Sequence, residues 1–113
     1  MTPEKLVTDV LDLANSSHIA HLASRSYAEH MALGEFYEGA RESVDALIEA
    51  MIGDDFPVPG FDGGAILAQI EKQYKKLCDE RDDTCQGCPT LENLYDELTG
   101  VYVKAIYKLK RFK

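Results

Sequence analysis

Apolar side chains recur every three or four residues along most of the chain, which is the spacing of one face of an α-helix. The clearest run lies between Tyr27 and Ile52, where eight apolar positions keep this spacing. Ser26 is the expected N-cap of this run, and Glu29 stands three residues later, where it would complete a capping box. The pattern therefore predicts one long amphipathic helix over residues 27–52.

The segment before this helix also has helical spacing. It begins at Pro3, with Thr2 as the expected N-cap and a proline in the first turn. This first helix ends either near Asn15 or, if it continues through two histidines, near Ala23. Residues 24–26 are expected to break the helical run.

The second half of the chain predicts two more helices, over residues 65–82 and 91–110. Thr90 is the expected cap of the last helix, and the sequence DDTCQGCP before it is expected to form a tight turn. Residues 53–64 contain two prolines and four glycines and predict a loop. Three apolar residues of this loop, Phe56, Val58 and Phe61, are expected to pack against the helices.

Four helices without a strand pattern predict an all-α protein, for which a four-helix bundle is the natural packing solution. A length of 113 residues is enough for one domain with a core of its own, so residues 1–113 are expected to form a single domain. The central loop spans roughly 40 Å when extended. Both an up-down-up-down topology and a ferritin-type crossover are therefore open.

The acidic balance of the chain limits its partners. A net charge of −8 argues against nucleic-acid binding by the body of the protein, because phosphate contacts need basic side chains. The exception is the basic C-terminal tail. One interpretation is that it contacts DNA or an acidic partner. The simpler interpretation is that its cations are favoured at a helix C-terminus. The tail contains Lys104, Lys108, Lys110, Arg111 and Lys113.

No apolar run approaches the roughly 20 residues of a membrane span. The N-terminal sequence is acidic and polar, unlike a secretory signal. The expected location is the cytoplasm, with no membrane partner.

The cysteines are odd in number, which makes a disulfide framework unexpected. Cys85 and Cys88 form a CxxC sequence at the predicted turn, and Cys78 lies seven residues upstream. Incidental or structural thiols are one interpretation. A bound metal or a disulfide that stabilises the turn is the other.

All three histidines and six acids lie between residues 18 and 49. Imidazole and carboxylate groups on neighbouring helical turns are ligands for iron, manganese or zinc. On a helical wheel at about 100° per residue, four of the acids form a stripe beside the apolar face, with His30 at its border. The residues alone leave open whether this stripe binds metal or is a solvated helix face. The stripe contains Glu38, Glu42, Asp45 and Glu49.

In this region the chain resembles the miniature ferritins, the Dps-like branch of the ferritin-like superfamily, and more closely the small ferritin-like proteins encoded by bacteriophages. In the miniature ferritins a histidine is followed by a second one, an aspartate and a glutamate at separations of twelve, fifteen and four residues. His18, His30, Asp45 and Glu49 stand at those separations. The phage-type pattern has its first histidine nine residues before the second, which is the position of His21.

The resemblance implies a ferritin-like four-helix bundle that binds iron, or another divalent metal, at a possible ferroxidase centre. It implies a homodimer or larger homo-oligomer, because the centre lies between subunits. His18 or His21 would act with His30 from one subunit, and Asp45 and Glu49 would come from the other.

The chain also departs from that pattern. No tryptophan follows the first histidine, and a further acid of the family falls on Gly34. The alternative is a non-catalytic helical interaction protein that keeps a ferritin-like scaffold. If the chain is encoded by a phage, such a protein would act in the virion or in the host cytoplasm.

Overall fold

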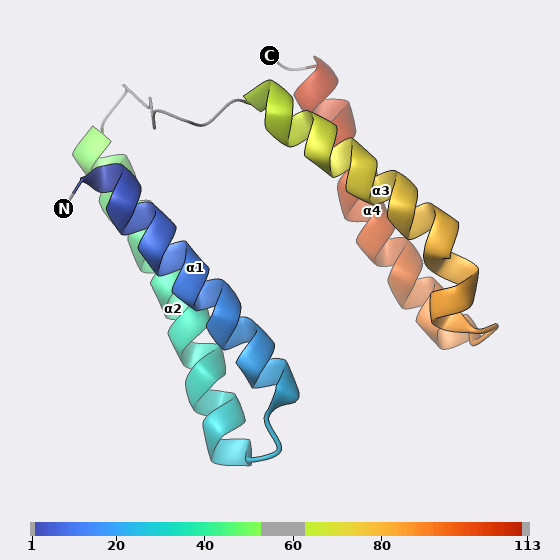
Figure 1. Cartoon of the computed structure of the whole chain (residues 1–113), viewed down its shortest axis with the longest axis horizontal. Coiled ribbons are helices and arrows are strands. Elements are labelled where there is room, and N and C mark those ends of the chain that lie inside the picture. Colours follow the sequence, from blue (N-terminus) through green and yellow to red (C-terminus); the bar gives the residue numbers. More distant parts are fainter. Residues whose placement is uncertain (1, 53–62, 112–113) are drawn as a thin grey trace. The chain divides into compact units, whose positions relative to one another are not determined.

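The computed structural model describes residues 2–52 and 63–111 (Figure 1). These residues form four α-helices and no strand, which confirms the all-α prediction. The helices are α1 (Pro3–Ala23), α2 (Tyr27–Ile52), α3 (Gly63–Cys85) and α4 (Pro89–Arg111).

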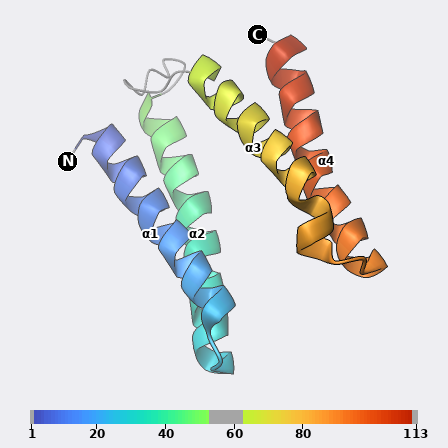
Figure 2. The same ribbon diagram turned by 45° about the vertical axis from the view of Figure 1, so that its right-hand side comes forward.

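The chain divides into two compact units, Met1–Phe61 and Asp62–Lys113, and each unit is a helical hairpin. In both views α1 runs along α2, and α3 runs along α4 (Figures 1 and 2). Two such helix pairs are the components of a four-helix bundle. A ferritin-like topology and a single domain over residues 1–113 stay predictions.

The first hairpin begins as its sequence predicts. The Thr2 hydroxyl accepts a hydrogen bond from the Lys5 amide at 3.1 Å, and Pro3 occupies the first helical position, where its missing N–H costs nothing. Of the two predicted ends, α1 takes the later one and continues to Ala23. Ser17 is buried in this extension, so packing against α2 favours a helix beyond Asn15.

Small side chains form the α1 side of the first hairpin's core. Ala14 is fully buried, and on α2 Tyr37, Val44 and Ile48 are at most 8% exposed. Other apolar residues of the predicted α2 face, Phe36, Leu47 and Met51, stay 44–55% exposed. The contact with α1 therefore covers only one edge of the apolar face, which is wider than one neighbouring helix can bury.

The turn between α3 and α4 is shorter than predicted. α3 continues to Cys85, and only Gln86 (φ 48°) and Gly87 (φ 73°) adopt the left-handed conformation of a tight turn. The predicted N-cap at Thr90 is wrong, because α4 already begins at Pro89. The fixed φ of proline suits the first helical position, and the Cys88 carbonyl accepts the first helical bond, from Glu92 at 2.9 Å.

Polar contacts join α3 to α4 near this turn. The Arg81 guanidinium donates to both carboxylate oxygens of Asp96, at 2.7 and 3.0 Å, and to Glu92 at 3.2 Å. The Tyr95 hydroxyl donates to the Leu77 carbonyl at 2.6 Å. These bonds fix the helix register at the turn end of the hairpin.

The side of α4 that contacts α3 only partly matches the buried side that helical spacing predicts. Helical spacing places seven apolar residues on the expected buried side: Leu94, Leu98, Val101, Tyr102, Ala105, Ile106 and Leu109. Of these, Leu94, Leu98 and Val101 are 46–64% exposed. Tyr102, Ala105 and Ile106 of the same predicted side are half-buried, and Tyr102 donates to Gln73 of α3. Tyr95, which lies outside the predicted side, donates to the Leu77 carbonyl. As in the first hairpin, a single neighbour covers one edge of a wide apolar face.

The expected packing of Phe56, Val58 and Phe61 lies outside the described residues. Among the helices that the structure describes, none has a stretch long and apolar enough to cross a bilayer.

The ion pair between Arg81 and Asp96 makes stability depend on pH. The Arg81 guanidinium holds the pKa of the Asp96 carboxyl below its ordinary value of 3.8. Because this pKa is depressed in the folded protein, the ion pair contributes its full stabilisation at pH values above the ordinary pKa. The contribution is lost as the pH falls through the lower, folded-state pKa. We expect Asp96→Asn to lower stability at pH 7 and to make the loss of stability below pH 4 shallower, in urea unfolding curves across a pH series. Glu97→Gln, at an exposed neighbouring acid, should leave that slope unchanged; equal slopes for wild type and Asp96→Asn would contradict the assignment.

Candidate functional site

The connection between α1 and α2 positions two of the three histidines. The Ser26 hydroxyl accepts a hydrogen bond from the Glu29 amide at 3.3 Å, which confirms Ser26 as the N-cap of α2. The predicted capping box is not completed by Glu29, because the Ser26 amide donates to the Ser24 hydroxyl at 3.2 Å. The Ser24 amide in turn donates to the His21 carbonyl at 3.3 Å. Short serine bonds thus hold the last turn of α1 next to the first turn of α2.

His21 and His30 bind each other reciprocally across the two helices. The Nδ1 of His21 lies 2.6 Å from the His30 carbonyl, and the Nδ1 of His30 lies 2.9 Å from the His21 carbonyl. A carbonyl oxygen only accepts, so both Nδ1 atoms carry a proton and donate. The two rings stack with centroids 3.6 Å apart and planes 21° apart. We call this arrangement the histidine clasp.

Gly34 provides the space for the clasp. A Cβ atom at this position would lie 3.2 Å from His21 Cε1 and 3.4 Å from His21 Nδ1, closer than side chains normally approach. An acidic side chain here, as in the miniature-ferritin pattern, would therefore have to displace the ring of His21 by a few tenths of an ångström. The departure from that pattern at Gly34 has a steric reason in this chain.

His18 has different contacts. Its ring stacks on Tyr37 with centroids 4.1 Å apart, and Arg41 Nη1 lies 3.4 Å from its Nδ1. Because a guanidinium only donates, the Nδ1 of His18 is the acceptor, and the proton of the neutral ring lies on Nε2. The guanidinium also lies 5.2 Å from the centroid of the Tyr37 ring. A fixed positive charge beside His18 is unfavourable for binding a second cation there.

The structure brings the three histidines together but leaves the predicted carboxylates at a distance. The rings of His18 and His21 lie 6.2 Å apart. Asp45 and Glu49 are exposed and follow His30 on the same helix by fifteen and nineteen residues. At 1.5 Å per residue these separations are about 22 Å and about 28 Å along the axis. Asp45 and Glu49 of the same chain therefore do not complete a site with the histidines.

The described residues contain no group of three or more histidines, cysteines and acids placed to hold a metal ion. The clasp itself also does not chelate one ion with both rings. A metal ion lies in the plane of the imidazole that binds it, and two stacked planes 3.6 Å apart do not share such a position. The predicted completion of the site by a second subunit stays a prediction.

The cysteines are free thiols in the structure. Burial raises the pKa of the Cys85 thiol, whereas Cys88 is exposed and its amide donates to the Cys85 carbonyl at 3.0 Å. A hydrogen bond with Cys78 raises the pKa of the Tyr74 hydroxyl. A buried neutral thiol at the end of α3 fits the structural interpretation of Cys85.

The sequence pattern did not assign Gly34, Tyr37 and Arg41 to the histidine cluster. One signal was present: Arg41 is the only base between His30 and Glu49, and it lies one helical turn after Tyr37. The contacts of His18 with both residues depend on how α1 and α2 are rotated against each other, which helical spacing does not give.

A family model described as "Family of unknown function (DUF5856)" matches residues 21–109. This match covers most of the chain and includes both histidines of the clasp. No curated protein and no solved structure matches the chain significantly. The resemblance to miniature ferritins therefore stays a prediction.

Gly34 and Gly39 on α2 allow a controlled test of the clasp. Gly39→Ala meets no atom within 4 Å, so it should stabilise the protein by about 1 kcal/mol through helix propensity. Gly34→Ala should lose this gain or destabilise the protein, because the new methyl group displaces the His21 ring. Urea unfolding curves measure both changes. A Gly34→Ala variant that is as stable as Gly39→Ala would contradict the close packing of His21.

Proposed function

The chain belongs to this family of unknown function, and from the geometry of its first hairpin we propose that it is a non-catalytic helical protein that associates with copies of itself. The observation that carries the proposal is a group of four exposed apolar side chains where α1 connects to α2. Their exposed fractions are 61% for Ile19, 72% for Leu22, 79% for Tyr27 and 44% for Met31. We call these four residues the closed-end patch.

Single exposed apolar residues are normal on protein surfaces, but a group of them is a common mark of an interaction site. All four patch residues lie within about two helical turns of the connection at residues 24–26. The histidine clasp joins the same two helix ends. The patch therefore loses little conformational freedom when a partner covers it, and this favours binding.

The charges beside the patch favour a second copy of the chain as the partner. Arg25 and Glu29 are both exposed, and neither has an ion-pair partner among the described residues. In a two-fold symmetric contact the same surface is used by both copies. Arg25 of one copy can then face Glu29 of the other, and this pair forms twice.

The expected dimer is of moderate strength. Covering one of these partly exposed side chains contributes on the order of 1–2 kcal/mol, so eight of them contribute on the order of 10 kcal/mol. Association costs about 4–15 kcal/mol in lost translational and rotational freedom. The surplus is small, and the dimer should dissociate on dilution.

Leu22→Asp tests the patch, because it places a charge in the middle of the expected contact. The dimer dissociation constant should rise by about 100-fold or more, since each dimer loses two leucine contacts. Sedimentation equilibrium over a range of concentrations measures this change. Asn15→Asp adds the same charge to an exposed position of α1 outside the patch and should leave the dissociation constant nearly unchanged. A wild-type protein that stays monomeric at high salt, or equal effects of the two substitutions, would overturn the proposal.

A second candidate function is metal binding between subunits, and the clasp supplies the observation that favours it. Metal-binding histidines usually donate their other ring N–H to a carbonyl or carboxylate. In His21 and His30 the Nδ1–H groups are held in this way, which leaves Nε2 as the atom for a ligand. Iron(II) or zinc would suit an imidazole nitrogen combined with the carboxylates of Asp45 and Glu49 from a second copy.

This arrangement requires a different dimer. The end of one hairpin at which α1 connects to α2 would lie beside the opposite end of the partner's hairpin, where Asp45 and Glu49 are. Anaerobic titration with iron(II), followed by calorimetry, should then show binding that Asp45→Ala/Glu49→Ala abolishes. Glu38→Ala/Glu42→Ala removes two acids of the same stripe and should retain it. Unchanged stoichiometry after loss of Asp45 and Glu49 would exclude this candidate.

A further inference from the structure

Charge is divided unevenly between the two hairpins. Residues 1–61 contain eleven acidic and three basic side chains, a net charge of −8. Residues 62–113 contain nine acidic and nine basic side chains and are neutral as a unit. The net charge of the whole chain is therefore that of the first hairpin.

Within the α3–α4 hairpin the charges also separate along its length. Most acids gather near the turn, around Arg81, whereas the remaining described bases lie in the middle of the hairpin and toward its opposite end. Lys110 is paired there with Glu71 at 3.2 Å, while the other six bases have no ion-pair partner among the described residues. All seven bases are exposed: Lys72, Lys75, Lys76, Lys104, Lys108, Lys110 and Arg111.

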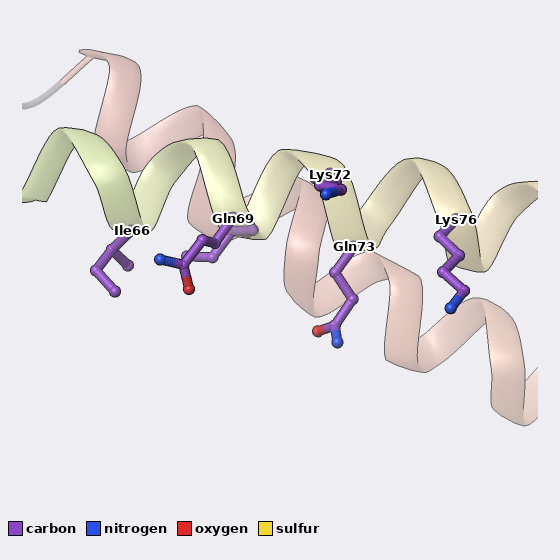
Figure 3. A pocket seen from close by; sticks show the side chains of 6 residues that line it. Ile66, Gln69, Lys72, Gln73 and Lys76 are labelled. Atoms are coloured by element: carbon purple, nitrogen blue, oxygen red, sulfur yellow. The ribbon is translucent and has the colours of Figure 1, made fainter.

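Three of these bases form a basic stripe on α4. Lys104, Lys108 and Arg111 are separated by four and three residues, so one of them appears at each helical turn. The α3 lysines lie elsewhere. Lys76 extends from the same side of α3 as Gln69 and Gln73, beside a groove that Lys72 also lines (Figure 3).

The acidic stripe of α2 has the matching spacing. Glu38, Glu42, Asp45 and Glu49 are separated by four, three and four residues, and all four are exposed without an ion-pair partner among the described residues. Opposite charges that repeat with the same helical period can meet at every turn when the two helices lie side by side. The basic stripe covers about 10 Å and the acidic stripe about 16 Å along their axes, so the acidic stripe is long enough.

We infer that the basic stripe of α4 in one copy of the chain docks along the acidic stripe of α2 in another copy. This inference rests on the proposed self-association, but it uses a different surface from the closed-end patch. The two stripes are not the same surface, so the contact is head-to-tail and leaves one stripe free on each outer copy. Further copies can add, and the assembly grows beyond a dimer.

A second copy fits the basic stripe better than nucleic acid does. The hairpin that carries the stripe is neutral as a unit, so it offers a polyanion no net positive charge. The acidic stripe of another copy is a local surface with the same period as the bases. Nucleic-acid binding is therefore the competing outcome of the test.

Sedimentation velocity of the full chain at two salt concentrations tests the inference, because exposed charge pairs are strongly screened at high ionic strength. At about 500 mM NaCl the closed-end dimer should remain, and at about 50 mM NaCl larger species should form. Reversing the basic stripe with Lys104→Glu/Lys108→Glu/Arg111→Glu should weaken the larger species by roughly 10- to 100-fold. Adding Glu42→Lys/Asp45→Lys/Glu49→Lys to the same chain should restore them, and this rescue does not depend on the stability of either single set.

Lys72→Glu/Lys75→Glu/Lys76→Glu is the matched control, since it changes the net charge by the same amount on α3. It should weaken the larger species much less than reversal of the basic stripe.

Equal effects of the two reversals, no rescue, or a single species of dimer mass at both salt concentrations would overturn the head-to-tail contact. So would binding of double-stranded DNA that the basic-stripe reversal abolishes while self-association is unchanged. A dimer at both salt concentrations leaves the closed-end proposal intact, whereas larger species at low salt with monomers at high salt support the stripe contact alone.

Discussion

The first hairpin depends on the contact between His21 and His30. Each ring donates to the backbone carbonyl of the other residue, so the contact ties the two helices by their main chains as well as by their side chains. A Cβ atom at position 34 would lie 3.2 Å from His21 Cε1, so any side chain there would have to displace the ring by a few tenths of an ångström. The glycine at position 34 follows from this close approach, and the serine connection holds the two helix ends in it.

Neither hairpin covers its own apolar surface. In each pair one helix meets only one edge of its neighbour's apolar face, and large side chains such as Phe36, Leu47 and Leu94 stay about half exposed. An amphipathic helix with such a wide face is suited to more than one packing partner. This property connects the fold to the proposed function, because association is what such helices need, with or without a bound metal. The family adds no activity, and a helical scaffold by itself does not specify one.

The site was only partly predictable. The sequence singled out the three histidines, and they do lie near one another in the structure. Their Nδ1 atoms, however, are engaged with carbonyls and with Arg41, and these contacts are not visible in a spacing pattern. The separation of Asp45 from His30 follows from helix length alone, and for that reason the sequence hypothesis needed a second subunit. The turn near Cys85 was misplaced because aspartates and glycine suggest a longer break than two left-handed residues require.

The sequence by itself determined the four helices, the limits of α2 at Tyr27 and Ile52, and the alignment of four acids along one side of α2. These are local properties, set by helical periodicity and by capping residues a few positions apart. Only the tertiary structure decided which edge of each apolar face is buried, why position 34 is a glycine, and which ring nitrogens are free. Those features depend on the rotation and offset of one helix against another, which many side chains set together and no short segment encodes.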